Sequence, residues 1–174
     1  MKLAFIGIGN VGFALANSFE KKGYDVIVAH NDSKSESVLN ALKQNTKFTT
    51  LALQEAIDKA DIIFLATPFH ANKEILKSLN FCGKTLVDCT NPVGAGISHG
   101  LESKISGAEK VQEWANDAKV VKSYTIYGFE NLRNPDFENY NAKPVMMIAG
   151  NDLESKEKVH ALNSDLGFET LDVG

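Results

Sequence analysis

The chain has 174 residues, a length that suits one domain with a substantial apolar core. Its 18 basic and 22 acidic residues give a net charge of −4, which excludes a general attraction to nucleic acid or to an anionic membrane. No apolar run approaches the ~20 residues that span a bilayer, and the N-terminus has no signal-peptide pattern, so we expect a cytoplasmic protein.

Strand and helix patterns alternate along the whole chain. Strands are expected at residues 2–6, 25–29, 47–50, 61–66, 84–88, 120–124, 144–149 and 168–171. Helices are expected at residues 10–22, 37–44, 53–59, 71–79, 108–116 and 152–165, with a short one near 129–133 in an irregular stretch over 128–143. This alternation predicts an α/β fold of Rossmann type, with a doubly wound, mostly parallel sheet of about eight strands.

The cysteines and histidines form no metal-binding pattern. Cys82 and Cys89 fit neither a C-x-x-C pair nor a zinc site, and we expect both to be free thiols. The four histidines are scattered, without the spacing of a paired ligand motif. We therefore predict no metal.

The turn between the first strand and the first helix carries the motif G-x-G-x-x-G. Its residues are Gly7, Ile8, Gly9, Asn10, Val11 and Gly12. Gly7 allows a tight turn, Gly9 leaves the backbone open to a pyrophosphate, and Gly12 lets the helix pack closely on the sheet. The positive end of that helix would face the phosphates. A purely structural turn is the alternative, but a strand before the motif and a helix after it favour one NAD(P)-binding domain over residues 1–174.

The residues after the second strand determine whether the domain prefers NAD or NADP. An acidic residue at the strand end would bind the ribose 2′-hydroxyl and repel a 2′-phosphate. Donors suited to a phosphate stand there instead, at His30, Asn31, Ser33 and Lys34. Asp32 follows two or three residues too late for the usual acid. NADP is the favoured cofactor, and NAD is the alternative.

Two further strand ends are candidate parts of the site. Thr67 and Pro68 end the fourth strand and would lie against the ribose and pyrophosphate. Asn91 and Pro92 follow the fifth strand, where the nicotinamide should lie, and the Asn91 amide can both donate and accept hydrogen bonds. Catalytic residues stay unassigned, because hydride transfer depends mainly on positioning the donor against the acceptor.

Seven segments occur in an order and spacing typical of one family. They cover residues 7–12, 88–92, 106–112, 120–124, 128–131, 148–152 and 166–169. With them the chain resembles, over nearly its whole length, the NADP oxidoreductase family that includes the coenzyme F420-dependent NADP oxidoreductases. It is also similar to the cytoplasmic domain of the STEAP metalloreductases. The resemblance implies an NADPH-binding fold that transfers two electrons to a flavin-like or deazaflavin (F420-type) small molecule.

The resemblance also places the cofactor contacts. The family's phosphate contacts fall on residues 8–11, and its 2′-phosphate contacts, usually Ser-Arg, fall on His30 and Asn31. The arginine is missing at that position, and Lys34 is the candidate to compensate for it. After the sixth strand the family often has Lys-Ala-Phe-Asn-Thr, where this chain has Lys-Ser-Tyr-Thr-Ile over residues 122–126.

Members of the family usually continue past the position of Asp172–Gly174 with a helical segment that helps to shape the acceptor site and the dimer. The chain stops there, so we expect a truncated, divergent or partly ordered form, with a homodimer as one option for its assembly. An NADPH-dependent oxidoreductase is the favoured function. A non-catalytic module that senses NAD(P)(H) is the alternative, and the altered residues after the sixth strand favour it.

Overall fold

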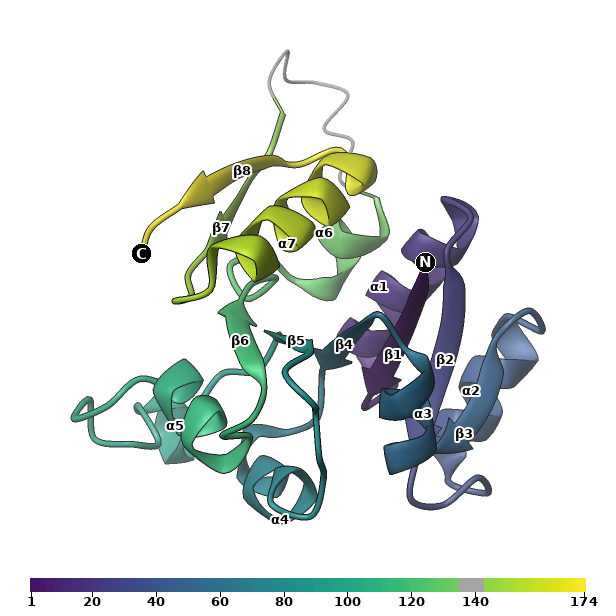
Figure 1. Cartoon of the computed structure of the whole chain (residues 1–174), viewed down its shortest axis with the longest axis horizontal. Helices are drawn as coiled ribbons and strands as arrows, with labels where there is room; N and C mark the ends of the chain where they lie inside the picture. The colour runs from purple at the N-terminus through teal and green to yellow at the C-terminus, as the bar shows by residue number, and fades with distance from the viewer. Residues whose placement is uncertain (135–142) are drawn as a thin grey trace.

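The computed structural model describes residues 1–134 and 143–174. Most of the second half of the predicted irregular stretch 128–143 lies outside these residues. The main sheet has six parallel strands in the order β3-β2-β1-β4-β5-β6 (Figure 1). Its strands are β1 (Lys2–Ile6), β2 (Asp25–His30), β3 (Thr49–Ala52), β4 (Ile62–Leu65), β5 (Thr85–Asp88) and β6 (Lys119–Lys122). The predicted Rossmann-type fold is confirmed.

The prediction of about eight strands in one sheet is wrong, because the last two strands form a sheet of their own. β7 (Val145–Ile148) pairs only with β8 (Glu169–Asp172) among the named strands, and the two are parallel. The end of β6 meets this segment at a single antiparallel bridge, in which Lys122 and Ala149 exchange both backbone hydrogen bonds, at 2.8 and 3.2 Å. The last βαβ unit is thus joined to the edge of the main sheet by this bridge and does not extend it with further parallel strands.

Helices cover both faces of the main sheet. The α-helices are α1 (Asn10–Lys21), α2 (Glu36–Gln44), α3 (Leu53–Lys59), α4 (Asn72–Leu76), α5 (Gly107–Trp114), α6 (Phe129–Arg133) and α7 (Leu153–Leu166), with short 3₁₀ turns η1 (Phe69–Ala71) and η2 (Ala95–Ile97). Buried side chains of α1, α2, α6 and α7 share one apolar cluster, and those of α3, α4 and α5 share the other. Figure 1 shows α6 and α7 gathered with the small sheet at one end of the molecule, and α4 and α5 at the other.

The strands reach both clusters because their side chains alternate between the two faces. In β1, Leu3 and Phe5 enter the cluster of α1 and α7, whereas Ala4 and Ile6 enter the other. Phe5 stacks on Phe64 of β4 with ring centroids 4.6 Å apart. Buried aromatic pairs of this kind contribute about 0.5–1.5 kcal/mol beyond their burial. The centre of the sheet is therefore a rigid support for the loops at its carboxyl edge.

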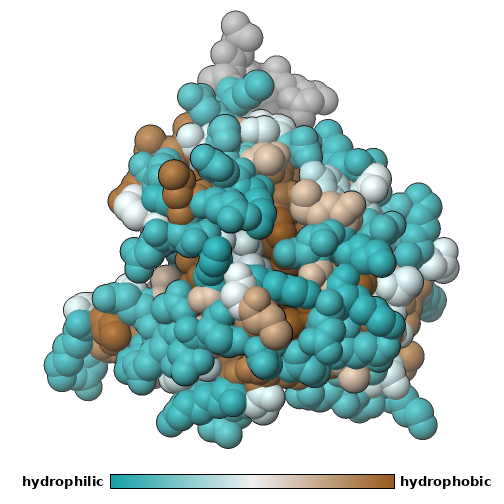
Figure 2. All heavy atoms as spheres, in the orientation of Figure 1, coloured by the Kyte–Doolittle hydropathy of each residue, from teal (hydrophilic) through white to brown (hydrophobic). Residues whose placement is uncertain are grey.

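The surface carries no large apolar region on the face drawn in Figure 2. Apolar side chains gather there in small groups, one of them at the upper left, where β7 and β8 lie in Figure 1. Met147 and Leu171, which face each other across the small sheet, are 43% and 48% exposed. No helix of the described part of the chain is long and apolar enough to cross a membrane.

Asp152, at the N-terminus of α7, makes the stability depend on pH. Its carboxylate accepts a hydrogen bond from the Ser155 N–H at 2.9 Å and lies 3.1 Å from Nζ of Lys119. The hydrogen bonds from Ser155 and the nearby Lys119 ammonium lower the pKa of Asp152 from 3.8 to about 2. Because the folded pKa is depressed, this carboxylate stabilises the fold above its unfolded pKa, and the contribution is lost as the pH falls through the folded pKa.

We therefore expect D152N to be less stable than the wild type at neutral pH, by a margin that shrinks as the pH falls from about 4 towards 2. Asparagine also caps helices well, so the substitution removes mainly the charge. Thermal unfolding of both proteins across this range measures the margin. A margin that stays constant with pH would contradict the role of the charge.

Candidate functional site

The three glycines of the motif divide into two structural positions and one open position. Gly7 has a φ of +93°, and a Cβ there would lie 2.7 Å from the backbone of Ala66. A Cβ on Gly12 would lie 2.1 Å from the carbonyl oxygen of Gly7. Gly9 has an ordinary φ of −70°, and a Cβ there would meet nothing within 4 Å. The fold itself needs glycine at positions 7 and 12. At position 9 it does not, and the space beside Gly9 is open to a ligand.

That open space lies at the N-terminus of α1. The N-cap residue, Gly9, has no side chain to cap this end of the helix, and the first turn contains no acidic residue. Phe13 donates to the Gly9 carbonyl oxygen at 2.8 Å, which is the first hydrogen bond of the helix. The N–H groups before Phe13 therefore have no partner within the helix, and the positive end of its dipole is not neutralised. Both features suit an anion such as a pyrophosphate.

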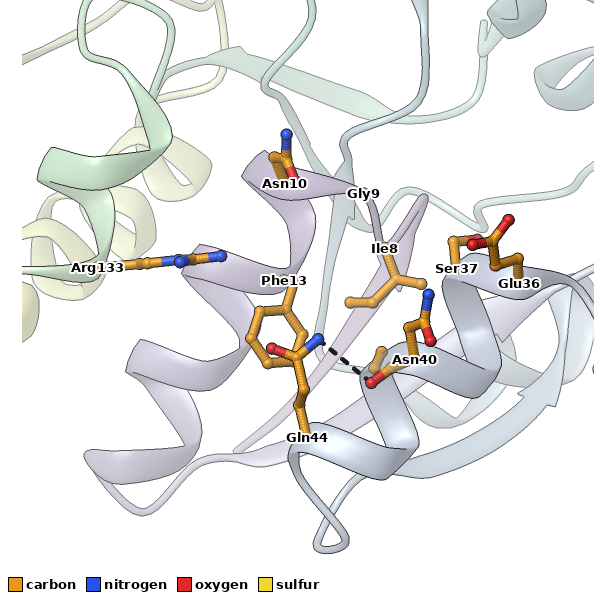
Figure 3. Close-up of a pocket in the computed structure, with 10 residues that line it drawn as sticks. Ile8, Gly9, Asn10, Phe13, Glu36, Ser37, Asn40, Gln44 and Arg133 are labelled. Carbon is orange, nitrogen blue, oxygen red and sulfur yellow. Dashed lines mark hydrogen bonds between the residues drawn. The ribbon is translucent and has the colours of Figure 1, made fainter.

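Two cavities flank this turn, and Ile8 and Ser37 line both of them. The α1–α2 cavity, of about 310 Å³, is lined by Gly9, Asn10 and Phe13 of the turn and α1, by α2, and by Arg133 of α6 (Figure 3). The β2-end cavity, of about 240 Å³, lies on the other side. It is lined by Gly7 and by residues 29–32 at the end of β2, together with Leu53, Thr67 and Ile75.

The end of β2 brings only part of the predicted cofactor loop to the β2-end cavity. His30, Asn31 and Asp32 line the cavity, and Nδ1 of His30 is a buried atom without a hydrogen-bond partner among the described residues. Ser33 and Lys34 line neither cavity. Asp32 closes a turn over these two residues by accepting the Lys34 N–H at 2.8 Å.

A polar network joins the carboxyl ends of the neighbouring strands β4, β5 and β6. Thr67 donates to the amide of Asn72 at 2.6 Å, and Asn72 donates to the Thr90 hydroxyl at 3.2 Å. Thr90 donates its N–H and its hydroxyl to Asp88, at 2.9 and 2.7 Å. Nζ of Lys122 lies 3.0 Å from the same carboxylate and also donates to the Thr90 carbonyl oxygen. Sequence reasoning missed this network, and the one local signal was the polar run that follows the buried part of β5.

The strand register explains why Asp88 and Lys122 meet. Asp88, the last residue of β5, is the register partner of Lys122, the last residue of β6. The Asp88 side chain is fully buried, and that of Lys122 is 21% exposed. A buried carboxylate needs such a partner, because desolvation penalises an isolated charge heavily. The pair therefore fixes the strand ends from which the residues after β5 emerge.

Three more of the predicted site residues lie near these strand ends. Pro68 is exposed beside η1, and Asn91 is exposed in the loop after β5. Pro92 packs against the start of α5, where a Cβ on Gly107 would lie 2.9 Å from its ring. None of the three lines the two cavities. Val11 and Gly12 lie within α1, with Val11 packed against the apolar cluster.

Two reactive side chains near the strand ends are buried. Burial raises the pKa of the Cys89 thiol, and the neighbouring Asp88 carboxylate adds to the effect, so the thiol stays protonated. Burial likewise raises the pKa of Tyr124, whose hydroxyl has no hydrogen-bond partner among the described residues. Tyr124 adopts a φ of +59° and lies 5.9 Å from the Phe64 ring. Neither group is suited to act as a nucleophile. The described residues contain no cluster of three or more His, Cys, Asp or Glu that could hold a metal ion.

A Rossmann-type sheet, an uncapped helix behind a glycine turn and flanking cavities together define a dinucleotide-binding domain. The model of the NADP oxidoreductase, coenzyme F420-dependent family matches residues 2–92, which is more than half of the chain. The chain belongs to this family. The resemblance expected from the sequence is confirmed, and so is NADP as the cofactor of the family.

Known relatives extend the match over the whole chain. Metalloreductase STEAP3 from Rattus norvegicus is 27% identical over 99% of this chain and 34% of its own length. The hypothetical protein SMa0349 from Sinorhizobium meliloti has a solved structure that is 26% identical, with a TM-score of 0.88 over 100% of this chain and 85% of that one. A structure from Arthrobacter sp. FB24, provisionally assigned as an F420-dependent NADP-reductase, shares the fold at 23% identity, with a TM-score of 0.81 and the same coverage. The chain spans about a third of the length of the curated relatives it matches.

Proposed function

We propose that this chain binds NADPH and transfers hydride between its nicotinamide and a small-molecule acceptor of the flavin or deazaflavin (F420) type. The observation that carries the proposal is the open backbone at Gly9, at the uncapped end of α1 and between two cavities. Membership of an NADP-dependent oxidoreductase family supports the same proposal. The bound cofactor would supply the hydride, and the chain would supply its position.

In this proposal each part of the dinucleotide has its own residues. Backbone N–H groups over residues 9–11 receive the pyrophosphate. The adenosine end enters the β2-end cavity, which His30 and Asn31 line. Ser33 and Lys34 lie outside the cavity, so in this proposal they donate to the phosphate of the adenosine end from its rim.

The nicotinamide side would lie over the ends of β4 and β5. Thr67 and Pro68 bound it on one strand, and Asn91 and Pro92 on the next. The network through Asp88 holds the backbone just before Asn91, so it fixes where the Asn91 amide lies relative to the cofactor. Such positioning is the main protein contribution to hydride transfer, because the cofactor carries the chemistry.

A panel of acceptors tests the proposal. The protein is mixed with NADPH, or with NADH as the matched control, and with FMN, FAD, F420, a ferric chelate or a quinone in separate assays. Loss of the reduced-nicotinamide absorbance is followed over time. We expect NADPH to be oxidised in the presence of a flavin or F420, and faster than NADH. Tight NADPH binding without turnover on any acceptor would contradict the enzyme and support a sensing module instead.

A further inference from the structure

Arg133 is the only arginine in the sequence, and it lies at a cavity beside the glycine turn. It is the last residue of α6, about 120 positions after the motif it approaches. Figure 3 shows its side chain reaching from α6 towards α1, between Asn10 and Phe13. The chain therefore places a permanent cation next to the uncapped end of α1.

The position of Arg133 is held by packing on both sides. Its guanidinium lies 5.1 Å from the ring centroid of Phe129 and 5.9 Å from that of Phe13, within the range of cation–π contacts. The preceding residue, Leu132, is fully buried, and its carbonyl oxygen accepts a hydrogen bond from Ser18 of α1 at 3.1 Å. This anchoring fixes α6 on α1, so the guanidinium approaches the turn from a defined direction.

Within residues 1–134 and 143–174, no carboxylate forms an ion pair with Arg133. The eight ion pairs found among the described residues are all made by lysines. Glu36 also lines the α1–α2 cavity, but on the opposite wall, at the start of α2 (Figure 3). A guanidinium that has no ion pair in the described part of the chain can offer its donors to a ligand with matching oxygens, such as a phosphate.

We propose that Arg133 binds the pyrophosphate of the dinucleotide, and this inference rests on the proposed function. Two observations favour the pyrophosphate over the 2′-phosphate. Arg133 approaches the turn on the side of Gly9 and Asn10, whereas His30 and Asn31 line the other cavity. The Glu36 carboxylate would also repel a 2′-phosphate placed deeper in the α1–α2 cavity. Arg133 thus contributes affinity that is common to NADPH and NADH.

Binding of NADPH and NADH to R133M tests the inference. Methionine keeps an unbranched apolar stem against the two aromatic rings and removes the charge. We expect the affinity for both nucleotides to fall by about tenfold or more, the usual value of a charge-assisted hydrogen bond. R133K keeps the charge without the planar fork, so its affinity should lie between those of R133M and the wild type. K158Q is the matched control, because it removes one positive charge from α7, which lines neither cavity, and it should bind both nucleotides like the wild type.

Each result separates the two proposals. If the wild type binds both nucleotides and R133M binds them equally tightly, the pyrophosphate contact is overturned while the proposed function stands. The same holds if R133M loses affinity for NADPH alone. A wild-type chain that binds neither nucleotide would overturn both. Thermal unfolding of each variant checks the fold, and if R133M does not fold, the comparison of R133K with K158Q decides: equal affinity in these two would contradict the contact.

Discussion

Replacing Gly9 with valine is expected to leave the unfolding temperature almost unchanged and to weaken NADPH binding by about 100-fold or more. A Cβ at this position meets no atom of the folded chain within 4 Å, and its φ of −70° suits any residue. A branched side chain would fill the space that the pyrophosphate needs. It would also keep phosphate oxygens from the N–H groups, and two or more lost charge-assisted hydrogen bonds account for an effect of about 100-fold. Calorimetric titration with NADPH and a thermal unfolding curve measure the two effects separately.

Gly12 supplies the contrasting variant. An alanine there would put its Cβ 2.1 Å from the carbonyl oxygen of Gly7, so the backbone must shift. We therefore expect G12A to lower the unfolding temperature as well as the affinity. If G9V bound NADPH as tightly as the wild type, the pyrophosphate would have to lie away from this turn. If G9V unfolded at the low temperature of G12A, its loss of binding would carry no information about the site.

Most of the main sheet could be predicted because its signals are local. The apolar runs at residues 26–28 and 62–65 become fully buried parallel strands, as their composition indicates. The third strand begins two residues later than expected, at Thr49. Residues 45–48 form a turn in which the Lys47 N–H donates to the Asn45 side chain at 3.0 Å, and Phe48 is buried with its ring centroid 6.0 Å from that of Phe13. A strand pattern alone does not reveal such a contact.

The separate β7–β8 sheet could not be predicted from strand patterns. An apolar run such as Val145–Ile148 indicates a strand but not the neighbour with which it pairs. The position of the small sheet depends on two contacts with the main sheet. One is the antiparallel bridge between Lys122 and Ala149, and the other is the hydrogen bond that the Ser155 hydroxyl of α7 accepts from Thr85 at 2.8 Å. Both contacts join residues far apart in the sequence, so only the folded chain shows them.

The candidate site divides in the same way. The glycine turn is a short motif, and each of its residues lies where the spacing predicts. Arg133 and the network around Asp88 were missed, because their meaning depends on elements that meet only in the fold. The arginine expected after β2 is absent from the sequence position, yet a cation reaches the cofactor turn from α6. In the proposed site, this positive charge comes from a helix that no local motif includes.

The Asp88–Lys122 pair is expected to dominate the stability of the strand ends. D88A should lower the free energy of unfolding by about 3–5 kcal/mol, because it leaves Lys122 without its carboxylate and Thr90 without an acceptor for two donors. K122M should cost a similar amount, since it leaves the fully buried Asp88 carboxylate uncompensated. Urea unfolding curves measure each free energy, with K158Q as the control for the loss of an exposed lysine.

The double variant D88A/K122M separates a buried pair from two independent losses. If the cost of each single change is mainly an unpaired buried group, removing both partners should cost clearly less than the sum of the two single changes. If the losses in the free energy of unfolding were strictly additive, Asp88 and Lys122 would not act as a buried pair. Single changes that cost less than about 1 kcal/mol, as for an exposed ion pair, would contradict it too. Because the pair holds the backbone that leads into Asn91, we also expect D88A to slow NADPH oxidation more than it weakens NADPH binding. The glycine turn and Arg133 would hold the phosphates, while this pair would set the geometry at the nicotinamide end.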